Sequence, residues 1–139
     1  MDVKKCLEKG FLKRVKPDKM EIKKELSESK NDMEDAKNSL KNGKYKWAII
    51  QAYYSMFHSA RTVLVSNGYR ERKHFAITIV LEHLVRSKKL ESYFVDDFKA
   101  AIFAREEADY SSVYSKERAE QILTAAEEFA DRMEKLVSF

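Results

Sequence analysis

Glycine and proline are scarce in this chain, with 3 Gly and 1 Pro among 139 residues. Sandwiches and barrels of β-strands need many tight turns, so this scarcity argues against them and favours long helices. The three glycines, Gly10, Gly43 and Gly68, are also too widely spaced to form a glycine-rich loop that cradles phosphate. The composition therefore predicts an all-α protein without such a loop.

Metal ligands and export signals are equally sparse. Cys6 is the only cysteine, which excludes an intramolecular disulfide and a cysteine-based zinc site. No two of His58, His74 and His83 have the i, i+4 spacing of a helical metal site, so we expect no metal and no cofactor. The N-terminus lacks the apolar segment of a signal peptide. Polar side chains interrupt the most apolar stretch, residues 47–65, so we expect a cytoplasmic protein without a membrane span.

Charge is plentiful and unevenly placed. Lys and Arg total 27 against 23 Asp and Glu, which gives a net charge of +4 and a pI near 9.0. Residues 1–24 contribute nine basic and four acidic side chains, whereas residues 105–139 contribute five basic and nine acidic. Because acids are interleaved with the N-terminal cations, a solvated basic helix face is favoured over a nucleic-acid contact there.

The length is typical of one domain, spanning residues 1–139, and the apolar spacing predicts an antiparallel up-and-down bundle of four to five helices. We expect helices over residues 18–42, 44–66, 74–87 and 90–108, and a last helix capped by Ser115. Residues 74–87 also alternate like a strand, but an isolated strand would have nothing to pair with. Residues 1–16 are expected to form a short N-terminal helix or arm, weakened by Gly10.

The expected helix over residues 44–66 is apolar around most of its axis, which is typical of a central, buried helix. A narrow polar stripe runs along it, formed by Lys44, Gln51, Ser55, His58 and Thr62. His58 on this stripe is either a hydrogen-bonded structural residue or a general acid or base. Of the adjacent Tyr53 and Tyr54, one ring can enter the core while the other reaches the stripe or a partner chain.

Arg105 falls on the inward stripe of its helix, three residues after Ile102 and seven after Phe98. A buried arginine needs a partner, which we expect to be Asp109, one helical turn further on, or another acidic or tyrosyl side chain. The spacing leaves two interpretations open: an ion pair at the helix end, or an arginine whose donors hold phosphate in a groove.

Several segments together resemble a known family. They are the string AYYSMFHSAR at residues 52–61, Gly68, Lys73-His74, and REEADY at residues 105–110. This layout resembles the HEPN domain superfamily, and specifically its small stand-alone prokaryotic members. The resemblance implies a homodimeric helical bundle that works with a minimal nucleotidyltransferase in a toxin–antitoxin-like or nucleotide-binding module. It also implies kinship with metal-independent ribonucleases, many of which carry an Arg-x4–6-His motif.

Arg105 matches the motif arginine, but no histidine follows it, and the Asp109-Tyr110 region occupies that place. The resemblance therefore leads us to expect a protein that binds a nucleotide or RNA. The predicted binding residues are Arg105, which would hold phosphate, Asp109, which would orient it, and Tyr110, Tyr54, His58, Lys73 and His74 around the groove. Two alternatives stay open: a metal-independent ribonuclease that uses Arg105 with His58 or His74, and a helical interaction scaffold without a ligand.

Overall fold

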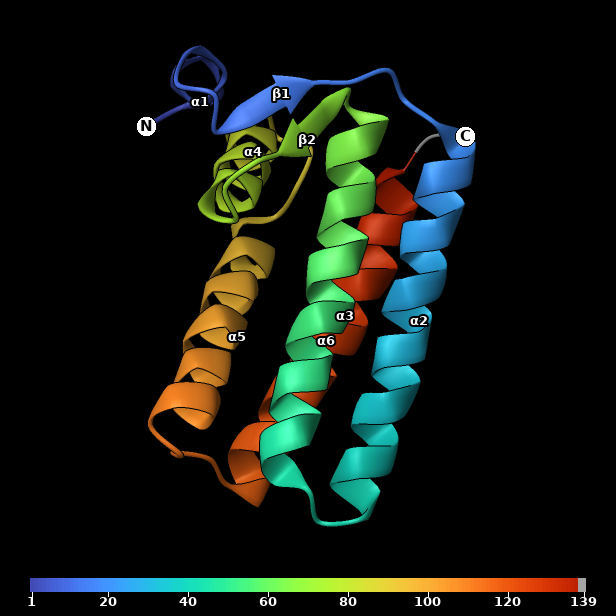
Figure 1. Ribbon diagram of the computed structural model, residues 1–139, viewed down its shortest axis with the longest axis vertical. Coiled ribbons are helices and arrows are strands. Elements are labelled where there is room, and N and C mark those ends of the chain that lie inside the picture. The colour runs from blue at the N-terminus through green and yellow to red at the C-terminus, as the bar shows by residue number, and fades with distance from the viewer. Residues whose placement is uncertain (138–139) are drawn as a thin grey trace.

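Four long helices form an antiparallel bundle in the computed structural model, which describes residues 1–137. They are α2 (Lys19–Lys41), α3 (Tyr45–Ser66), α5 (Ser92–Tyr110) and α6 (Lys116–Leu136). In Figure 1, α2 runs down the page, α3 runs up, α5 runs down and α6 returns upward. Two short helices, α1 (Val3–Glu8) and α4 (Phe75–Arg86), lie at one end. The predicted all-α up-and-down bundle is therefore confirmed.

The helices begin and end where local chemistry favours it. The Asp18 carboxylate accepts hydrogen bonds from the N–H groups of Met20 and Glu21, which caps the start of α2. The Ser115 hydroxyl accepts from the N–H of Arg118 and caps α6, as predicted. Gly43 follows α2 with a φ of 73°, a left-handed conformation that favours glycine and lets the chain reverse into α3.

The predicted central helix is α3, which packs against α2, α5 and α6. Its apolar residues with no exposed surface are Ala48, Ile49, Ala52, Met56, Ala60, Val63, Leu64 and Val65. Part of the predicted polar stripe is buried too, because it faces α2 rather than an open groove. Ser29 of α2 and Ser55 of α3 each donate a hydroxyl hydrogen bond to the other's carbonyl, at 2.7 and 2.8 Å. These bonds satisfy polar groups inside the bundle.

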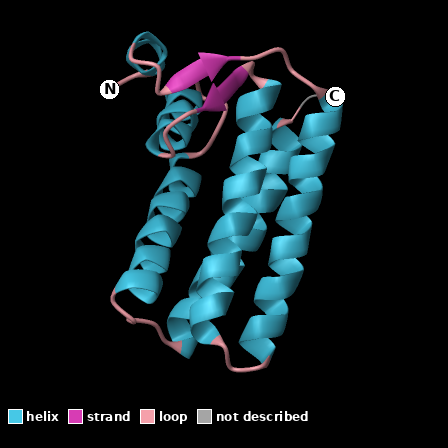
Figure 2. Cartoon of the chain, viewed as in Figure 1, coloured by secondary structure: helices cyan, strands magenta, loops and turns pink. Residues whose placement is uncertain are grey.

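The N-terminal segment departs from the expectation. Helix α1 ends at Glu8, because Gly10 adopts a φ of 75° and turns the chain into strand β1 (Leu12–Arg14). Strand β1 pairs antiparallel with β2 (Tyr69–Glu71), which lies between two of the expected helices. Figure 2 shows this small sheet resting against the end of the bundle. The pairing joins segments more than fifty residues apart, which local periodicity does not reveal.

Residues 75–86 form helix α4, so the choice of helix over strand in this segment is confirmed. The strand tendency there is overridden because Ala76, Ile77, Val80 and Leu81 have a helical spacing and are all buried. Across the described residues, every helix is either too short or too polar to span a bilayer.

Candidate functional site: an arginine among tyrosines

Arg105 on α5 extends over tyrosine side chains of α3 and of its own helix. Its Nη2 donates a hydrogen bond of 3.2 Å to the hydroxyl of Tyr54. Its guanidinium carbon lies 5.4 Å from the ring centroid of Tyr53, 5.8 Å from that of Tyr54 and 5.9 Å from that of Tyr110. Such distances are typical of cation–π contacts. We call these four residues the Arg105 cluster.

Of the partners considered for Arg105, the structure shows a tyrosyl hydroxyl and no ion pair with Asp109. Helix α5 does continue through Asp109, but that side chain is exposed and makes no ion pair with Arg105. The guanidinium reaches across to α3 because the tyrosine rings there offer both a hydroxyl acceptor and an electron-rich face. Arg105 is half-buried rather than largely buried, and its tyrosyl contact is the alternative partner that we expected.

One donor of Arg105 has no partner within the described chain. The Nε atom is buried and makes no hydrogen bond. Buried donors in folded proteins are nearly always satisfied, so an exception at a surface cluster calls for an explanation. An anionic ligand is one acceptor that would satisfy Nε and compensate the charge.

The buried ring of Phe57 is surrounded by Tyr54 of the Arg105 cluster and by two further predicted residues, His58 and His74. The centroid of Phe57 lies 6.2 Å from that of Tyr54, 5.5 Å from that of His58 and 5.0 Å from that of His74. His74 is exposed, so the aromatic row leads from the Arg105 cluster to the surface near α4. Lys73 is exposed as well, and its contact is through the backbone, where its N–H donates to the carbonyl of Phe11.

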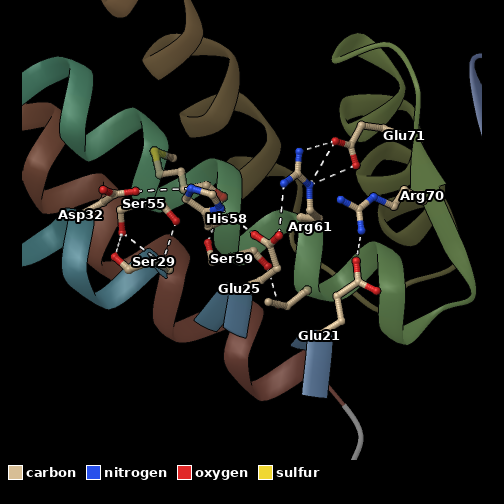
Figure 3. A network of polar contacts seen from close by, with 12 residues as sticks. Glu21, Glu25, Ser29, Asp32, Ser55, His58, Ser59, Arg61, Arg70 and Glu71 are labelled. Atoms are coloured by element: carbon tan, nitrogen blue, oxygen red, sulfur yellow. Dashed lines mark hydrogen bonds and ion pairs between the residues drawn. The ribbon is translucent and has the colours of Figure 1, made fainter. Parts of the chain in front are cut away.

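His58 lies between two acidic residues of α2 (Figure 3). Its Nδ1 is 2.6 Å from a carboxylate oxygen of Glu25, and its Nε2 is 3.5 Å from one of Asp32. The hydrogen bond to Glu25 raises the pKa of His58, although burial opposes this. Burial would raise the pKa of Glu25, but the hydrogen bond from His58 and the charge of Arg61 outweigh it and lower that pKa. Both ring nitrogens of His58 are therefore engaged by carboxylates, which favours its protonated form.

Arg61 completes this arrangement one turn further along α3. Its Nε and Nη2 both donate to the carboxylate of Glu71, the latter at 2.7 Å, and its Nη1 donates to Glu25 at 3.2 Å. The guanidinium also lies over the ring of Phe57, at 4.3 Å from the centroid. Only 4% of the Glu71 side chain is exposed. We call Glu25, His58, Arg61 and Glu71 the paired network.

The sequence analysis missed this network. A signal was present on α2, where Glu21, Glu25 and Asp32 recur at intervals of four and seven residues and share one face. Glu21 forms a further ion pair with Arg70 of β2. The network thus ties the strand β2 to both α2 and α3, and it leaves His58 and Arg61 engaged with carboxylates.

The Arg105 cluster and the paired network differ chemically, because the cations of the paired network are engaged with carboxylates. The Arg105 cluster offers a cation, hydroxyls and ring faces, which suit the phosphates and bases of a nucleotide. No group of three or more His, Cys, Asp or Glu side chains among residues 1–137 is arranged to hold a metal ion. The site is thus a half-buried arginine bordered by tyrosine side chains at the edge of a helical bundle.

Comparison with known proteins identifies the family. A family model of the HEPN domain matches residues 22–136, and the chain belongs to this family. A protein of Methanocaldococcus jannaschii, named "Putative toxin MJ0605", is 30% identical over 97 residues, which cover 68% of this chain and 72% of that protein. The expected resemblance is confirmed.

Proposed function

We propose that this chain is the HEPN component of a toxin–antitoxin-type module and that the Arg105 cluster binds the phosphate of a nucleotide or RNA. The observation that carries the proposal is the buried Nε of Arg105, which has no acceptor within the chain. The M. jannaschii relative, whose name describes a toxin, supports the type of module.

The chemistry of the cluster fits this ligand class. A guanidinium presents a planar fork of donors that matches phosphate oxygens, and here one edge of the fork is already anchored by Tyr54. Tyr110 is 74% exposed, so its ring has a free face on which a base can stack. Asp109, next to Tyr110 in the chain, is exposed and forms no ion pair with Arg105 among the described residues.

A homodimer and a nucleotidyltransferase partner complete the proposal. Exposed aromatic side chains lie on the C-terminal half of α5 and on the segment that follows, where Phe103, Tyr110 and Tyr114 are 57%, 74% and 47% exposed. Apolar surface of this kind favours a protein contact next to the Arg105 cluster. Light scattering at micromolar concentration should give twice the chain mass of 16.3 kDa, and a monomer would contradict the dimer.

The binding proposal is tested with ATP and with a short single-stranded RNA. We expect Arg105→Gln to weaken binding of one of the two by about 10- to 100-fold, since a charged hydrogen bond contributes about 1.5–3 kcal/mol. Arg132→Gln is the matched control, because it removes the same charge from an arginine that pairs with Glu91 on the surface. Equal binding by both variants would contradict the proposal.

Incubating the protein with the same RNA and a chelator tests for metal-independent cleavage, which distinguishes a ribonuclease from a protein that only binds RNA. His58 has both ring nitrogens beside carboxylates, so His74 is the histidine available to act with Arg105. If the wild-type protein cleaves the RNA and both Arg105→Gln and His74→Ala abolish cleavage, the protein is a ribonuclease rather than a binding protein. No binding and no cleavage by the wild-type protein would favour an interaction scaffold.

A further inference from the structure

A second group of cations lies at the end of the molecule that holds the N-terminal segment, on side chains that do not belong to the paired network. It lines a cleft of about 660 Å³ between α1, the small sheet and α4. The lining residues are Asp2, Val3, Lys4, Leu7, Arg14, Tyr69, His83 and Arg86. We call this the N-terminal cleft. In Figure 1 the elements that form it lie above α5, whereas Arg105 belongs to the far end of α5.

The cations of this cleft come from three separate elements. Lys4 lies on α1, Arg14 on β1 and Arg86 on α4, and all three side chains are exposed. None of them forms an ion pair among the described residues, in contrast to Arg61 and Arg70, which are paired with glutamates. Positive charge is therefore gathered here without being neutralised.

The acidic residues that alternate with these cations in the sequence are mostly kept out of the cleft. Of the four acids among residues 1–24, only Asp2 lines it. The Asp2 carboxylate accepts a 2.8 Å hydrogen bond from the N–H of Lys5, which engages it at the start of α1. Glu21 is engaged by Arg70. The fold thus separates charges that the linear sequence interleaves, which removes the objection to an anion site in this segment.

Tyr69 gives the cleft an aromatic wall. The guanidinium carbon of Arg14 lies 5.6 Å from the Tyr69 ring centroid, and the ring is half-buried. An arginine held on a ring is pre-oriented, and the combination of cations with an exposed aromatic edge is typical of surfaces that bind single-stranded nucleic acid. The volume falls in the range of sites that enclose a nucleotide-sized ligand.

We propose that the N-terminal cleft is a second phosphate-binding site, which holds phosphate groups on Arg14 and Arg86. Asp2, Val3, Lys4, Leu7 and Arg14 precede residue 22, so much of the cleft lies outside the segment matched by the family. Arg14 precedes the family match whereas Arg86 lies within it, and the site does not depend on the Arg105 cluster. The phosphate comes either from an RNA strand or from a free polyphosphate group such as that of a nucleotide.

The test uses the full chain with the double variant Arg14→Gln/Arg86→Gln. The control is Lys23→Gln/Lys135→Gln, which removes the same charge from exposed lysines that do not line the cleft. Thermal unfolding monitored by circular dichroism should be unchanged in both, because all four side chains are exposed. If the double variant unfolds at a lower temperature than the wild type, the titrations use the single variant Arg86→Gln instead. Arg86 lies on the surface of α4.

Binding of a fluorescein-labelled single-stranded RNA is then measured by anisotropy over a range of salt concentrations. If the source is RNA, the cleft variant loses affinity relative to the control. The slope of log K against log salt also becomes shallower by about 0.7 for each lost phosphate contact, or about 1.4 for two. If the source is a free polyphosphate, the cleft variant loses binding of inorganic tripolyphosphate in calorimetry while its RNA binding matches that of the control.

Equal behaviour of the cleft variant and the control toward both probes would overturn the proposal. Titrating Arg105→Gln in parallel distinguishes binding at the Arg105 cluster from binding at the N-terminal cleft. Loss of binding in Arg105→Gln alone supports the Arg105 cluster and refutes the N-terminal cleft, whereas loss in the cleft variant alone does the reverse.

Discussion

Arg61 and Arg105 lie on neighbouring helices of one bundle, both beside the aromatic residues of α3, yet their surroundings differ in charge. Arg61 donates to two glutamates and leaves no acid nearby unpaired. Arg105 meets only tyrosines and keeps one buried donor without an acceptor. The comparison teaches that an arginine in a small bundle stabilises the fold when carboxylates surround it. An arginine without carboxylate neighbours stays available to bind a ligand.

The energetic reason lies in the cost of burying charge. Glu25 and Glu71 are almost enclosed, with 9% and 4% of their side chains exposed, and a buried carboxylate that loses its cationic partner destabilises the fold. Arg105 is half-buried and remains in partial contact with water, so it persists without a counter-ion. Its counter-ion can therefore come from a ligand.

The largest effect is expected from Arg61→Ala. The substitution leaves the carboxylate of Glu71 without its cationic partner and removes one of the two partners of Glu25, which should lower the free energy of unfolding by about 3–5 kcal/mol. Urea denaturation measures the loss. Arg61→Lys keeps the charge but not the two parallel hydrogen bonds to Glu71. Its free energy of unfolding should therefore lie between that of Arg61→Ala and that of the wild type. A loss below about 1 kcal/mol in Arg61→Ala would show that the paired network does not hold the fold.

A smaller effect is expected from pH, through His58. Because pairing with Glu25 raises its pKa above the ordinary value of 6.5, the folded state binds a proton more tightly than the unfolded state. The resulting stabilisation is complete below the unfolded value and is lost as pH rises through the folded pKa. The free energy of unfolding should thus decrease as pH rises above about 6.5, which urea titrations at several pH values would detect.

His58→Gln is the control for this pH effect, since it removes the titrating group. The decrease should become shallower in this variant, and an unchanged decrease would assign it to another group. Glu25 stays ionised throughout the range because its own pKa is lowered.

The smallest effect on stability is expected from the Arg105 cluster. Arg105→Gln removes one hydrogen bond to the hydroxyl of Tyr54 and leaves no acid unpaired, so the free energy of unfolding should change by less than about 1.5 kcal/mol. Tyr54→Phe, which removes the hydroxyl alone, should change it by a similar or smaller amount. Urea denaturation of both variants checks this. A loss as large as that of Arg61→Ala would contradict the distinction between the two arginines.

The bundle could be predicted from the sequence because its signals are local. Periodic apolar residues and the caps at Gly43 and Ser115 lie within single helices, so the long helices were located to within a few residues. The sheet could not be found in this way. Leu12 pairs with Glu71, and nothing near Leu12 in the chain indicates a partner so distant.

The candidate site was predicted only in part, for the same reason. Arg105 and Tyr54 were identified and do make contact. Asp109, the partner favoured by spacing, forms no ion pair with Arg105, because i+4 geometry permits an ion pair without forcing one when a ring on another helix competes. His58 was identified as a groove residue, whereas its partners on α2 were missed because helix packing, rather than sequence distance, brings them together.

The most direct test measures stability and ligand binding on the same two variants, Arg61→Lys and Arg105→Gln. Both are folded at low temperature if the expected losses hold, so binding of ATP and single-stranded RNA can be compared directly. The account predicts that Arg61→Lys loses stability and keeps binding, and that Arg105→Gln keeps stability and loses binding by about 10-fold or more. It would be contradicted if Arg105→Gln bound both ligands as the wild type does, or if its binding fell only in proportion to a loss of folded protein.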